Sequence, residues 1–200
     1  MSAQNIDGKA LAKKIRSDLK DLVSEIEGPL GRKPGLAVVL VGEDPASQVY
    51  VKAKTKAAKG CGIEVSDHFL SADVSDEDLQ AKLKELSADQ TVDGILLQLP
   101  LPKGLDEFSA LLSIAPEKDA DGLHPMNQGL LLRGADTLES CTPKGCIALI
   151  DKAREDLGQS KDLSGLHAVV VGRSILVGKP VGLMLLERNC TVTYLSLIHI

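Results

Sequence analysis

Short runs of apolar residues alternate with longer amphipathic segments along this chain, and glycines and prolines separate them. Residues 36–41 form a continuous apolar run rich in β-branched side chains, which is typical of a strand covered on both faces. Strands of this kind, each followed by a helical segment, predict right-handed crossovers and a parallel sheet with helices on both sides. The sequence therefore predicts an α/β fold, in which ligands bind at the carboxyl ends of the strands.

Periodicity and capping residues predict where each element begins and ends. Apolar residues recur at helical spacing through residues 6–26, and Gly28-Pro29 is expected to end that helix. Ser75 is the expected N-cap of a second amphipathic helix, and Thr142 is the expected N-cap of a later one. The predicted helices cover residues 6–26, 46–59, 77–86, 146–157 and 180–187, and the predicted strands cover residues 36–41, 63–70, 94–97, 167–171 and 191–194.

The composition argues against several classes of protein. The 200 residues carry a net charge of −5 with two Phe, two Tyr and no Trp, so the chain offers neither a basic stripe nor stacking aromatics for nucleic acid. No apolar run approaches the roughly 20 residues of a membrane helix, and no leader-like segment is visible, which favours the cytoplasm. The four cysteines form no Cys-x-x-Cys pair and have no histidine at metal-ligand spacing. We expect buried reduced thiols, no metal, and a small molecule as the partner.

Lys54 lies on an unusual face of the helix predicted at residues 46–59. At about 100° per residue and with Tyr50 at zero, Lys54 falls near 40° and Ser47 near 60°. The other lysines of the segment cluster between about 180° and 240°. A lysine among such neighbours is desolvated, which disfavours its ammonium form and suits proton transfer. A lysine whose stem packs while its ammonium reaches water gives the same pattern, so helix geometry leaves both interpretations open.

Gln98 is a polar residue at the carboxyl end of the apolar strand predicted at residues 94–97. Pro100 and Pro102 prevent the strand from continuing past it, so its side chain is expected to face the ligand crevice. An amide there is able to accept a hydrogen bond from Lys54 and hold its orientation. A bond from Gln98 to a nearby loop explains the same residue equally well.

Asp121 stands in the sequence Asp-Ala-Asp-Gly, which is a strong turn signal. It is either a turn-forming residue or an anchor for a ligand, and its sequence context alone does not separate the two. His124 follows closely and is expected to be a loop histidine with its hydrogen bonds satisfied inside the protein.

The loop at residues 172–178 lies between a predicted strand and a predicted helix and begins and ends with glycine. Its amides and the following helix N-terminus are expected to cradle a phosphate, with Arg173 available to pair with it. The loop lacks the full G-x-G-x-x-G spacing, and any tight strand-to-helix turn favours glycine, so the pattern taken alone is weak.

Five motifs together carry a resemblance to a known family. They are DPAS-x-x-Y-x-x-x-K at residues 44–54, QLPLP at 98–102, DG-x-HP-x-N-x-G at 121–129, CTP-x-G at 141–145 and GRS-x-x-VG-x-P at 172–180. In this order and spacing the chain, from about residue 7 to residue 194, resembles the bifunctional methylenetetrahydrofolate dehydrogenase/cyclohydrolase family. The Tyr50-x-x-x-Lys54 spacing also occurs in short-chain dehydrogenases, but their glycine-rich loop precedes the tyrosine, whereas here it follows.

The resemblance implies an enzyme of one-carbon metabolism that supports purine biosynthesis. Members use a nicotinamide cofactor, usually NADP, to oxidise 5,10-methylenetetrahydrofolate to the methenyl form, and then add water to give 10-formyltetrahydrofolate. By resemblance Lys54 is the general acid/base of the hydrolysis, Gln98 positions it, and Asp121 binds the pterin. The implied substrate-binding residues also include Tyr50, Ser47, Leu99 and Pro100, and the implied cofactor-binding residues are Gly172, Arg173, Ser174 and Gly178. A homodimer is also implied.

The same resemblance predicts two domains. Residues 1–143 are expected to form the folate-binding catalytic domain, and residues 144–200 the start of a Rossmann-like NADP-binding domain. The pattern fits until Tyr194 and then fails, since the family continues with a polar His-Ser-x-Thr-like turn that this chain lacks. We therefore hypothesise that residues 195–200 are not native and that the chain is truncated. The alternative function is a folate-binding fragment without dehydrogenase activity.

Overall fold

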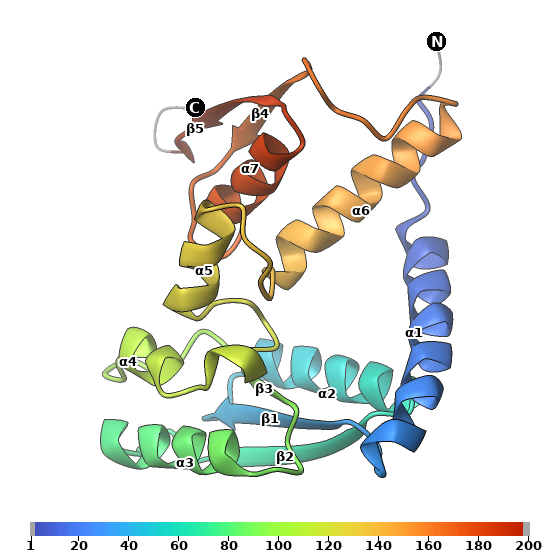
Figure 1. Cartoon of the computed structure of the whole chain (residues 1–200). Coiled ribbons are helices and arrows are strands. Elements are labelled where there is room, and N and C mark those ends of the chain that lie inside the picture. Colours follow the sequence, from blue (N-terminus) through green and yellow to red (C-terminus); the bar gives the residue numbers. More distant parts are fainter. Residues whose placement is uncertain (1–2, 198–200) are drawn as a thin grey trace. The chain divides into compact units, whose positions relative to one another are not determined.

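The computed structural model describes residues 3–197, which divide into two compact units (Figure 1). The first unit comprises residues 13–125, and the second comprises residues 3–12 together with residues 126–197. Helices separate the strands in sequence and every strand pair is parallel, so the predicted α/β class is confirmed. The elements in chain order are α1 (Gly8–Leu30), β1 (Gly35–Val41), α2 (Pro45–Gly60), β2 (Glu64–Leu70), α3 (Asp76–Ala88), β3 (Gly94–Leu97), α4 (Glu107–Leu112), the 3-10 helix η1 (Pro116–Lys118), α5 (Pro125–Leu132), α6 (Cys141–Asp156), β4 (His167–Val171), α7 (Gly178–Glu187) and β5 (Thr191–Leu195).

The first unit is built on a three-stranded parallel sheet in the order β2-β1-β3. β1 pairs along its whole length with β2, from Gly35 opposite Glu64 to Val41 opposite Leu70. On its other side β1 pairs with β3. All three strands therefore end at one edge of the sheet, which is where polar residues of the following loops gather.

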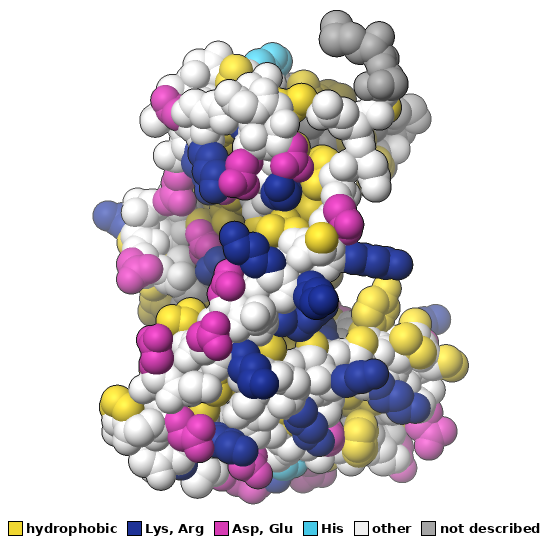
Figure 2. Space-filling model, turned by 90° about the vertical axis from the view of Figure 1, so that its right-hand side faces the viewer, with side chains coloured by type: hydrophobic (Ala, Val, Ile, Leu, Met, Phe, Trp, Pro, Cys, Tyr) yellow, Lys and Arg dark blue, Asp and Glu magenta, His cyan; other side chains and the backbone are white. Residues whose placement is uncertain are grey.

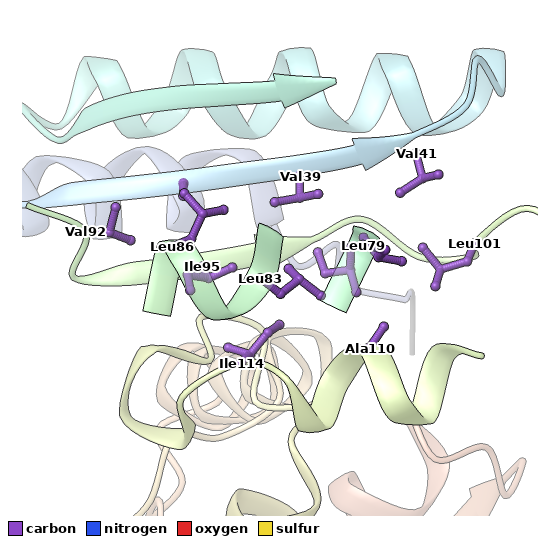
Figure 3. Packing of buried hydrophobic residues seen from close by; sticks show 12 residues of the cluster. Val39, Val41, Leu79, Leu83, Leu86, Val92, Ile95, Leu101, Ala110 and Ile114 are labelled. Carbon is purple, nitrogen blue, oxygen red and sulfur yellow. The ribbon is translucent and has the colours of Figure 1, made fainter. Parts of the chain in front are cut away.

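Apolar side chains cover both faces of this sheet, as the continuous apolar run of β1 predicts. Val38 and Leu40 of β1 pack with Val51 of α2 on one face. The other face packs against α3 and α4, and Figure 3 shows the side chains interdigitating between the strands and these helices. That larger cluster comprises Ala37, Val39, Val41, Leu79, Leu83, Leu86, Val92, Ile95, Leu97, Leu101, Ala110 and Ile114. Burial on both faces makes this sheet a rigid support for the residues at its carboxyl edge.

An arginine and an aspartate connect the amino-terminal ends of β1 and β3. Arg32 donates to both carboxylate oxygens of Asp93, at 2.6 and 2.8 Å, and the backbone N–H of Gly35 donates to Asp93 Oδ2 at 2.7 Å. The hydrogen bonds from Arg32 are the main reason that the pKa of Asp93 lies below its ordinary value. Because the folded state prefers the ionised carboxylate, the interaction stabilises the fold above the pKa of an unfolded aspartate, about 3.9.

We therefore predict that Asp93→Asn lowers the free energy of unfolding at neutral pH but flattens its fall in acid. The wild-type chain loses the Asp93 contribution as the pH drops from about 4 through the lower folded pKa, whereas the variant has no such contribution to lose. Urea denaturation at a series of pH values measures this, with Asp18→Asn on α1 as the matched control. Equal acid sensitivity in wild type and Asp93→Asn would contradict the assignment.

The second unit contains the two-stranded parallel sheet β4-β5 and helices α5, α6 and α7. Its apolar cluster joins Leu131, Ile147, Val181 and Leu185, and Ala168, Val170 and Val192 pack against it from the strands. The opposite face of the sheet is open, since Val169 is 53% exposed and Val171 is 57% exposed. The predicted covering of the sheet by helices on both sides is therefore not observed at β4 within the described residues, because helices cover only one of its faces.

Two predicted helix boundaries are wrong. The first helix does not stop at Gly28-Pro29 but continues through both residues to Leu30, where Gly31 ends it with a φ of 70°. The prolyl ring removes one hydrogen bond near the last turn, and the helix tolerates this. The helix α6 begins at Cys141 with Ser140 as N-cap, so Thr142 lies inside the first turn. Pro143 also lies in this first turn, where its missing N–H costs no hydrogen bond because first-turn amides have no intrahelical partner.

The helix α1 exposes most of its apolar stripe. Ile15, Leu22 and Ile26 are 48%, 55% and 49% exposed, and Val23 is the buried residue of this helix. The periodicity thus predicts the helix correctly, whereas the burial of its stripe is not seen in the described residues. Within residues 3–197, no helix combines the length and apolar character needed to cross a membrane.

The four cysteines are free thiols in different environments. Cys61 and Cys190 are buried, as predicted, and Cys146 is partly buried. Cys141 is exposed at the first position of α6, so the prediction of burial is wrong for this residue.

Candidate functional site

The helix α2 begins at the carboxyl edge of the first sheet, and its own N-terminal cap fixes that starting point. Asp44 accepts a hydrogen bond from the backbone N–H of Ser47 at 2.8 Å, and Pro45 occupies the first helical position. This bond is the main reason that the pKa of Asp44 lies below its ordinary value. The cap fixes the helix start directly after β1, and Lys54 follows in the middle of the helix.

Lys54 and Asp121 form an ion pair across the first unit. Lys54 Nζ lies 3.4 Å from Asp121 Oδ2, and the two side chains are 37% and 20% exposed. Asp121 reaches this position because the segment before it continues the sheet: the N–H of Ala120 donates to the carbonyl of Ile95 at 3.1 Å. A partly exposed ion pair of this length contributes at most about 1 kcal/mol to stability, so its more important consequence is to position the two side chains.

Asp119 holds the loop that carries Asp121. Its side chain is only 2% exposed, and Oδ2 accepts a hydrogen bond from the backbone N–H of His124 at 2.7 Å. His124 is itself buried, in line with the prediction of a loop histidine enclosed by the protein. Asp119 was not identified as important from the sequence. The pattern that indicates it is the Asp-x-Asp pair, in which Asp119 holds the loop and Asp121 reaches Lys54.

Gln98 lies at the end of β3 and is 9% exposed. Its Nε2 donates to the carbonyl of Leu99 at 2.6 Å, while Oε1 is buried without a hydrogen-bond partner among the described residues. Of the two partners that the sequence left open for Gln98, the structure shows the nearby loop, whereas Lys54 pairs with Asp121. A buried acceptor without a donor costs about 1–3 kcal/mol, which a ligand N–H or the lysine ammonium is able to relieve.

The face of α2 around Lys54 is more open than the sequence predicts. Ser47 is buried at 3% exposure, but Tyr50 is 63% exposed and the Lys54 side chain 37%. Of the two interpretations left open by the sequence, the exposure of Lys54 fits the one in which the stem packs and the ammonium reaches water. A ring-containing ligand lying on Tyr50 would exclude water from Lys54.

Leu99 and Pro100 continue from Gln98 around the same edge. Leu99 is partly buried against the larger apolar cluster and Pro100 is exposed. A separate cavity of about 630 Å³ lies where β1 and β2 end; Phe69, Gln48 and Lys52 are among the residues that line it. Lys54, Gln98 and Asp121 do not line that cavity, and their exposure falls from 37% at the Lys54 side chain to 9% at Gln98.

The loop before α7 is closed by its own hydrogen bonds. Ser174 Oγ accepts from the N–H groups of Val177 and Gly178, at 3.1 and 3.3 Å, and the carbonyl of Ser174 accepts from Lys179 at 3.0 Å. The N–H groups of Val177, Gly178 and Lys179 thus have partners inside the loop, and the expectation that this segment cradles a phosphate stays a prediction. Gly178 is required for this closure, since a Cβ there would lie 2.6 Å from the carbonyl oxygen of Gly172.

Charged side chains remain available beside this loop. Arg173 and Lys179 are exposed and border a cavity of about 450 Å³ in the second unit. Its other walls are mainly apolar and include Leu131, Leu183 and Tyr194. An apolar wall next to two cations suits a planar ring that carries phosphate.

The first α/β unit carries a lysine–carboxylate pair at the ends of its strands. The second contains a strand, a glycine-bounded loop and a helix in succession. These features define an enzyme-like protein with a nucleotide-binding domain. The model of the tetrahydrofolate dehydrogenase/cyclohydrolase catalytic domain matches residues 6–121, and that of the NAD(P)-binding domain of the same enzymes matches residues 140–198. The chain belongs to the tetrahydrofolate dehydrogenase/cyclohydrolase family, which confirms the family predicted from the sequence.

Curated relatives include the bifunctional protein FolD of Phenylobacterium zucineum, which is 50% identical over 193 residues, and that of Sphingopyxis alaskensis, which is 51% identical over 191 residues. The alignments cover 96% of this chain but 63% and 61% of those relatives. Among solved structures, the bifunctional FolD enzyme from Campylobacter jejuni is 41% identical with a TM-score of 0.89, covering 96% of this chain and 66% of that one. The Trypanosoma brucei enzyme, solved with NADP and an inhibitor, is 36% identical with a TM-score of 0.87, covering 98% and 65%.

The predicted domain boundary between residues 143 and 144 stays a prediction. The compact units meet between residues 125 and 126, whereas the family models leave residues 122–139 unassigned. The hypothesis that residues 195–200 are not native also stays open. Leu195 pairs with Val171 at the end of β5, and residues 198–200 lie outside the described residues.

Proposed function

We propose that this protein oxidises 5,10-methylenetetrahydrofolate with NADP and hydrolyses the resulting 5,10-methenyltetrahydrofolate to 10-formyltetrahydrofolate. The observation that carries the proposal is the group formed by Lys54, Asp121 and Gln98 at one edge of the first sheet. Lys54 Nζ lies 3.4 Å from Asp121 Oδ2, and the buried Oε1 of Gln98 accepts no hydrogen bond among the described residues. The family membership supports it. This chain spans about 63% of the length of the curated relative from Phenylobacterium zucineum. The activity of the whole relative is therefore a proposal for this chain.

Lys54 is proposed as the base of the hydrolysis. Water attacks the positively charged methenyl carbon, and Lys54 accepts a water proton as the carbon–oxygen bond forms. One carbon–nitrogen bond then breaks, its nitrogen takes a proton, and a formyl group remains on the other nitrogen. One proton is released for each water consumed. A cationic substrate beside Lys54 favours the neutral amine that this step requires.

Asp121 and Gln98 are proposed to bind and orient the substrate around that lysine. The carboxylate of Asp121 accepts N–H groups of a pterin, which draws it away from Lys54 and weakens the ion pair. The Oε1 of Gln98 is then available to accept from Lys54 or from the substrate. Tyr50 offers an exposed ring on which the aromatic part of a folate can stack, and Leu99 and Pro100 form the adjoining edge.

The residues of the second unit fit an NADP molecule in their chemistry. Arg173 and Lys179 are cations next to the apolar cavity of about 450 Å³. The oxygen of the Ser174 hydroxyl accepts hydrogen bonds from two backbone N–H groups, and its proton is available to donate to a phosphate. Gly172 and Gly178 carry no side chain at the two ends of the loop, and an added Cβ at Gly178 would lie 2.6 Å from the carbonyl oxygen of Gly172. Arg173 favours NADP over NAD because a guanidinium pairs well with the additional phosphate. Bound NADP would supply the hydride acceptor for the oxidation.

The cellular setting is also proposed. We infer a cytoplasmic homodimer whose partners are tetrahydrofolate one-carbon derivatives, without nucleic acid or membrane. The free cysteines suit a reducing compartment, and the exposed apolar face of β4 and β5 suits coverage by another surface.

Two absorbance assays on the purified chain test the proposed function. Loss of methenyltetrahydrofolate reports the hydrolysis, and NADPH formation from 5,10-methylenetetrahydrofolate reports the oxidation. We expect both above the rates in buffer. Hydrolysis without NADPH formation would favour a chain whose nucleotide-binding part is not functional. Folate binding with neither reaction would identify the alternative, a folate-binding fragment.

A further inference from the structure

A second charged feature of the first unit lies between α1 and α2, away from the candidate site. A groove of about 510 Å³ is lined by four basic side chains, Lys13, Arg16, Lys20 and Lys56, and no acidic side chain lines it. We call this feature the basic groove. Figure 2 looks onto the side of the molecule that carries α1, where Lys and Arg side chains gather over the lower part of the view.

The sequence places three of these cations on one face of α1. Lys13, Arg16 and Lys20 are spaced three and four residues apart, which is the spacing of neighbours along a helix. At about 100° per residue, Asp18 lies nearly opposite this stripe and Asp21 lies about 80° from Lys13, to its side. The helix is held in place by the buried Val23, and at the groove itself by the Cys61 thiol, which donates to the carbonyl of Arg16 at 3.5 Å.

The floor of the basic groove comes from small residues of α2. Ala53, Ala57 and Gly60 face the groove at spacings of four and three residues, and Cys61 closes it below. The small side chains of these residues do not fill the groove, and the four cationic side chains surround it. All four cations are exposed, and none of them takes part in an ion pair recorded for residues 3–197.

We propose that the basic groove binds a small multivalent anion that carries several carboxylate or phosphate groups. Four like charges around one hollow repel one another, and a ligand with several negative charges relieves the repulsion at each of them. In a protein with a net charge of −5, such a local excess of positive charge directs anions to this place. A single carboxylate meets only one or two of the cations and gains less.

Two sources supply this chemistry. One is a free polyphosphate or polycarboxylate. The other is a chain of glutamates attached to a folate, and this second source rests on the proposed function. The helix α2 links the two places, because Ala53 and Ala57 lie one position before and three positions after Lys54. A folate bound at Lys54 is thus able to direct a carboxylate chain along α2 toward the basic groove.

Inorganic tripolyphosphate is the first probe, because its binding does not depend on the proposed folate site. Calorimetry at low ionic strength is expected to show saturable binding to the wild-type chain that weakens as salt is added. Arg16→Gln/Lys20→Gln is expected to weaken binding about tenfold, since two exposed charge pairs are lost. Lys14→Gln/Lys52→Gln removes the same charge outside the groove and is expected to change binding by less than about twofold.

Folates with one and with several glutamates separate the two sources. If Arg16→Gln/Lys20→Gln weakens the binding of the oligoglutamyl folate but not that of the monoglutamyl folate, the groove holds the glutamate chain of the substrate. If the variant loses tripolyphosphate but binds both folates as the wild type does, the groove holds a free anion. Absence of saturable tripolyphosphate binding, or equal losses in both double variants, would overturn the proposal and would leave the proposed folate chemistry untouched.

Discussion

The variant Lys54→Met is expected to lose methenyl hydrolysis, with a rate at least about a hundredfold below that of the wild-type chain, because general base catalysis contributes that much or more. Folate binding is expected to remain within a few-fold of wild type. Asp121, Gln98 and Tyr50 provide the proposed binding contacts, and methionine keeps the length of the lysine stem. The loss of absorbance of methenyltetrahydrofolate measures the rate, and equilibrium binding of a folate measures the affinity.

Lys52→Met is the matched control for this variant. Lys52 lies on the same helix two residues earlier, is exposed, and lines the separate cavity at the end of β1 and β2. Its substitution removes the same charge and is expected to leave the hydrolysis rate nearly unchanged. Near-wild-type turnover by Lys54→Met, or equal losses in both variants, would show that Lys54 is not the base.

Gly35→Ala is expected to destabilise the first unit strongly. A Cβ at Gly35 would lie 2.0 Å from the carbonyl oxygen of Thr91, which is a backbone atom and cannot rotate away. The N–H of Gly35 also donates to Asp93, and its carbonyl accepts from the N–H of Asp93 at 2.8 Å. Separating these two segments costs about 3 kcal/mol, at the upper end of the usual range for an added methyl group in a packed site.

Gly145→Ala tests whether this effect depends on the site. Gly145 lies inside α6, where an added Cβ meets nothing within 4 Å. Alanine in a helix interior is favoured over glycine by about 0.5–1 kcal/mol, so this variant is expected to be slightly more stable. Urea denaturation of both variants measures the two shifts. A Gly35→Ala chain as stable as wild type would contradict the close approach of β1 to Thr91.

Elements with strong local signals were predicted well from the sequence. The strands at residues 94–97 and 167–171 coincide with β3 and β4, since short apolar runs between turn residues allow few alternatives. Ser75 caps α3 as predicted, with its Oγ accepting from Asp78 N–H at 3.0 Å. The C-terminal limit of α1 was missed because a proline near the last turn weakens a helix without ending it, and Gly31 provides the actual stop.

The candidate site shows what periodicity cannot predict. Helical projection separates Lys54 from the other lysines of α2, but it does not indicate which residue comes to meet it. The partner, Asp121, is 67 residues away and reaches Lys54 through the pairing of its loop with β3. The exposure of Tyr50 and the internal bonds of Ser174 likewise depend on tertiary packing and loop conformation, which local sequence patterns do not contain.

The rate of methenyltetrahydrofolate hydrolysis by the wild-type chain, measured without NADP, tests the central claim most directly. The residues assigned to this step all lie in the first unit, at its carboxyl edge. Catalysis above the rate in buffer, and its loss in Lys54→Met, is the predicted result. A wild-type chain that binds the folate but leaves its hydrolysis at the buffer rate would contradict the assignment of Lys54, Gln98 and Asp121 as a catalytic site.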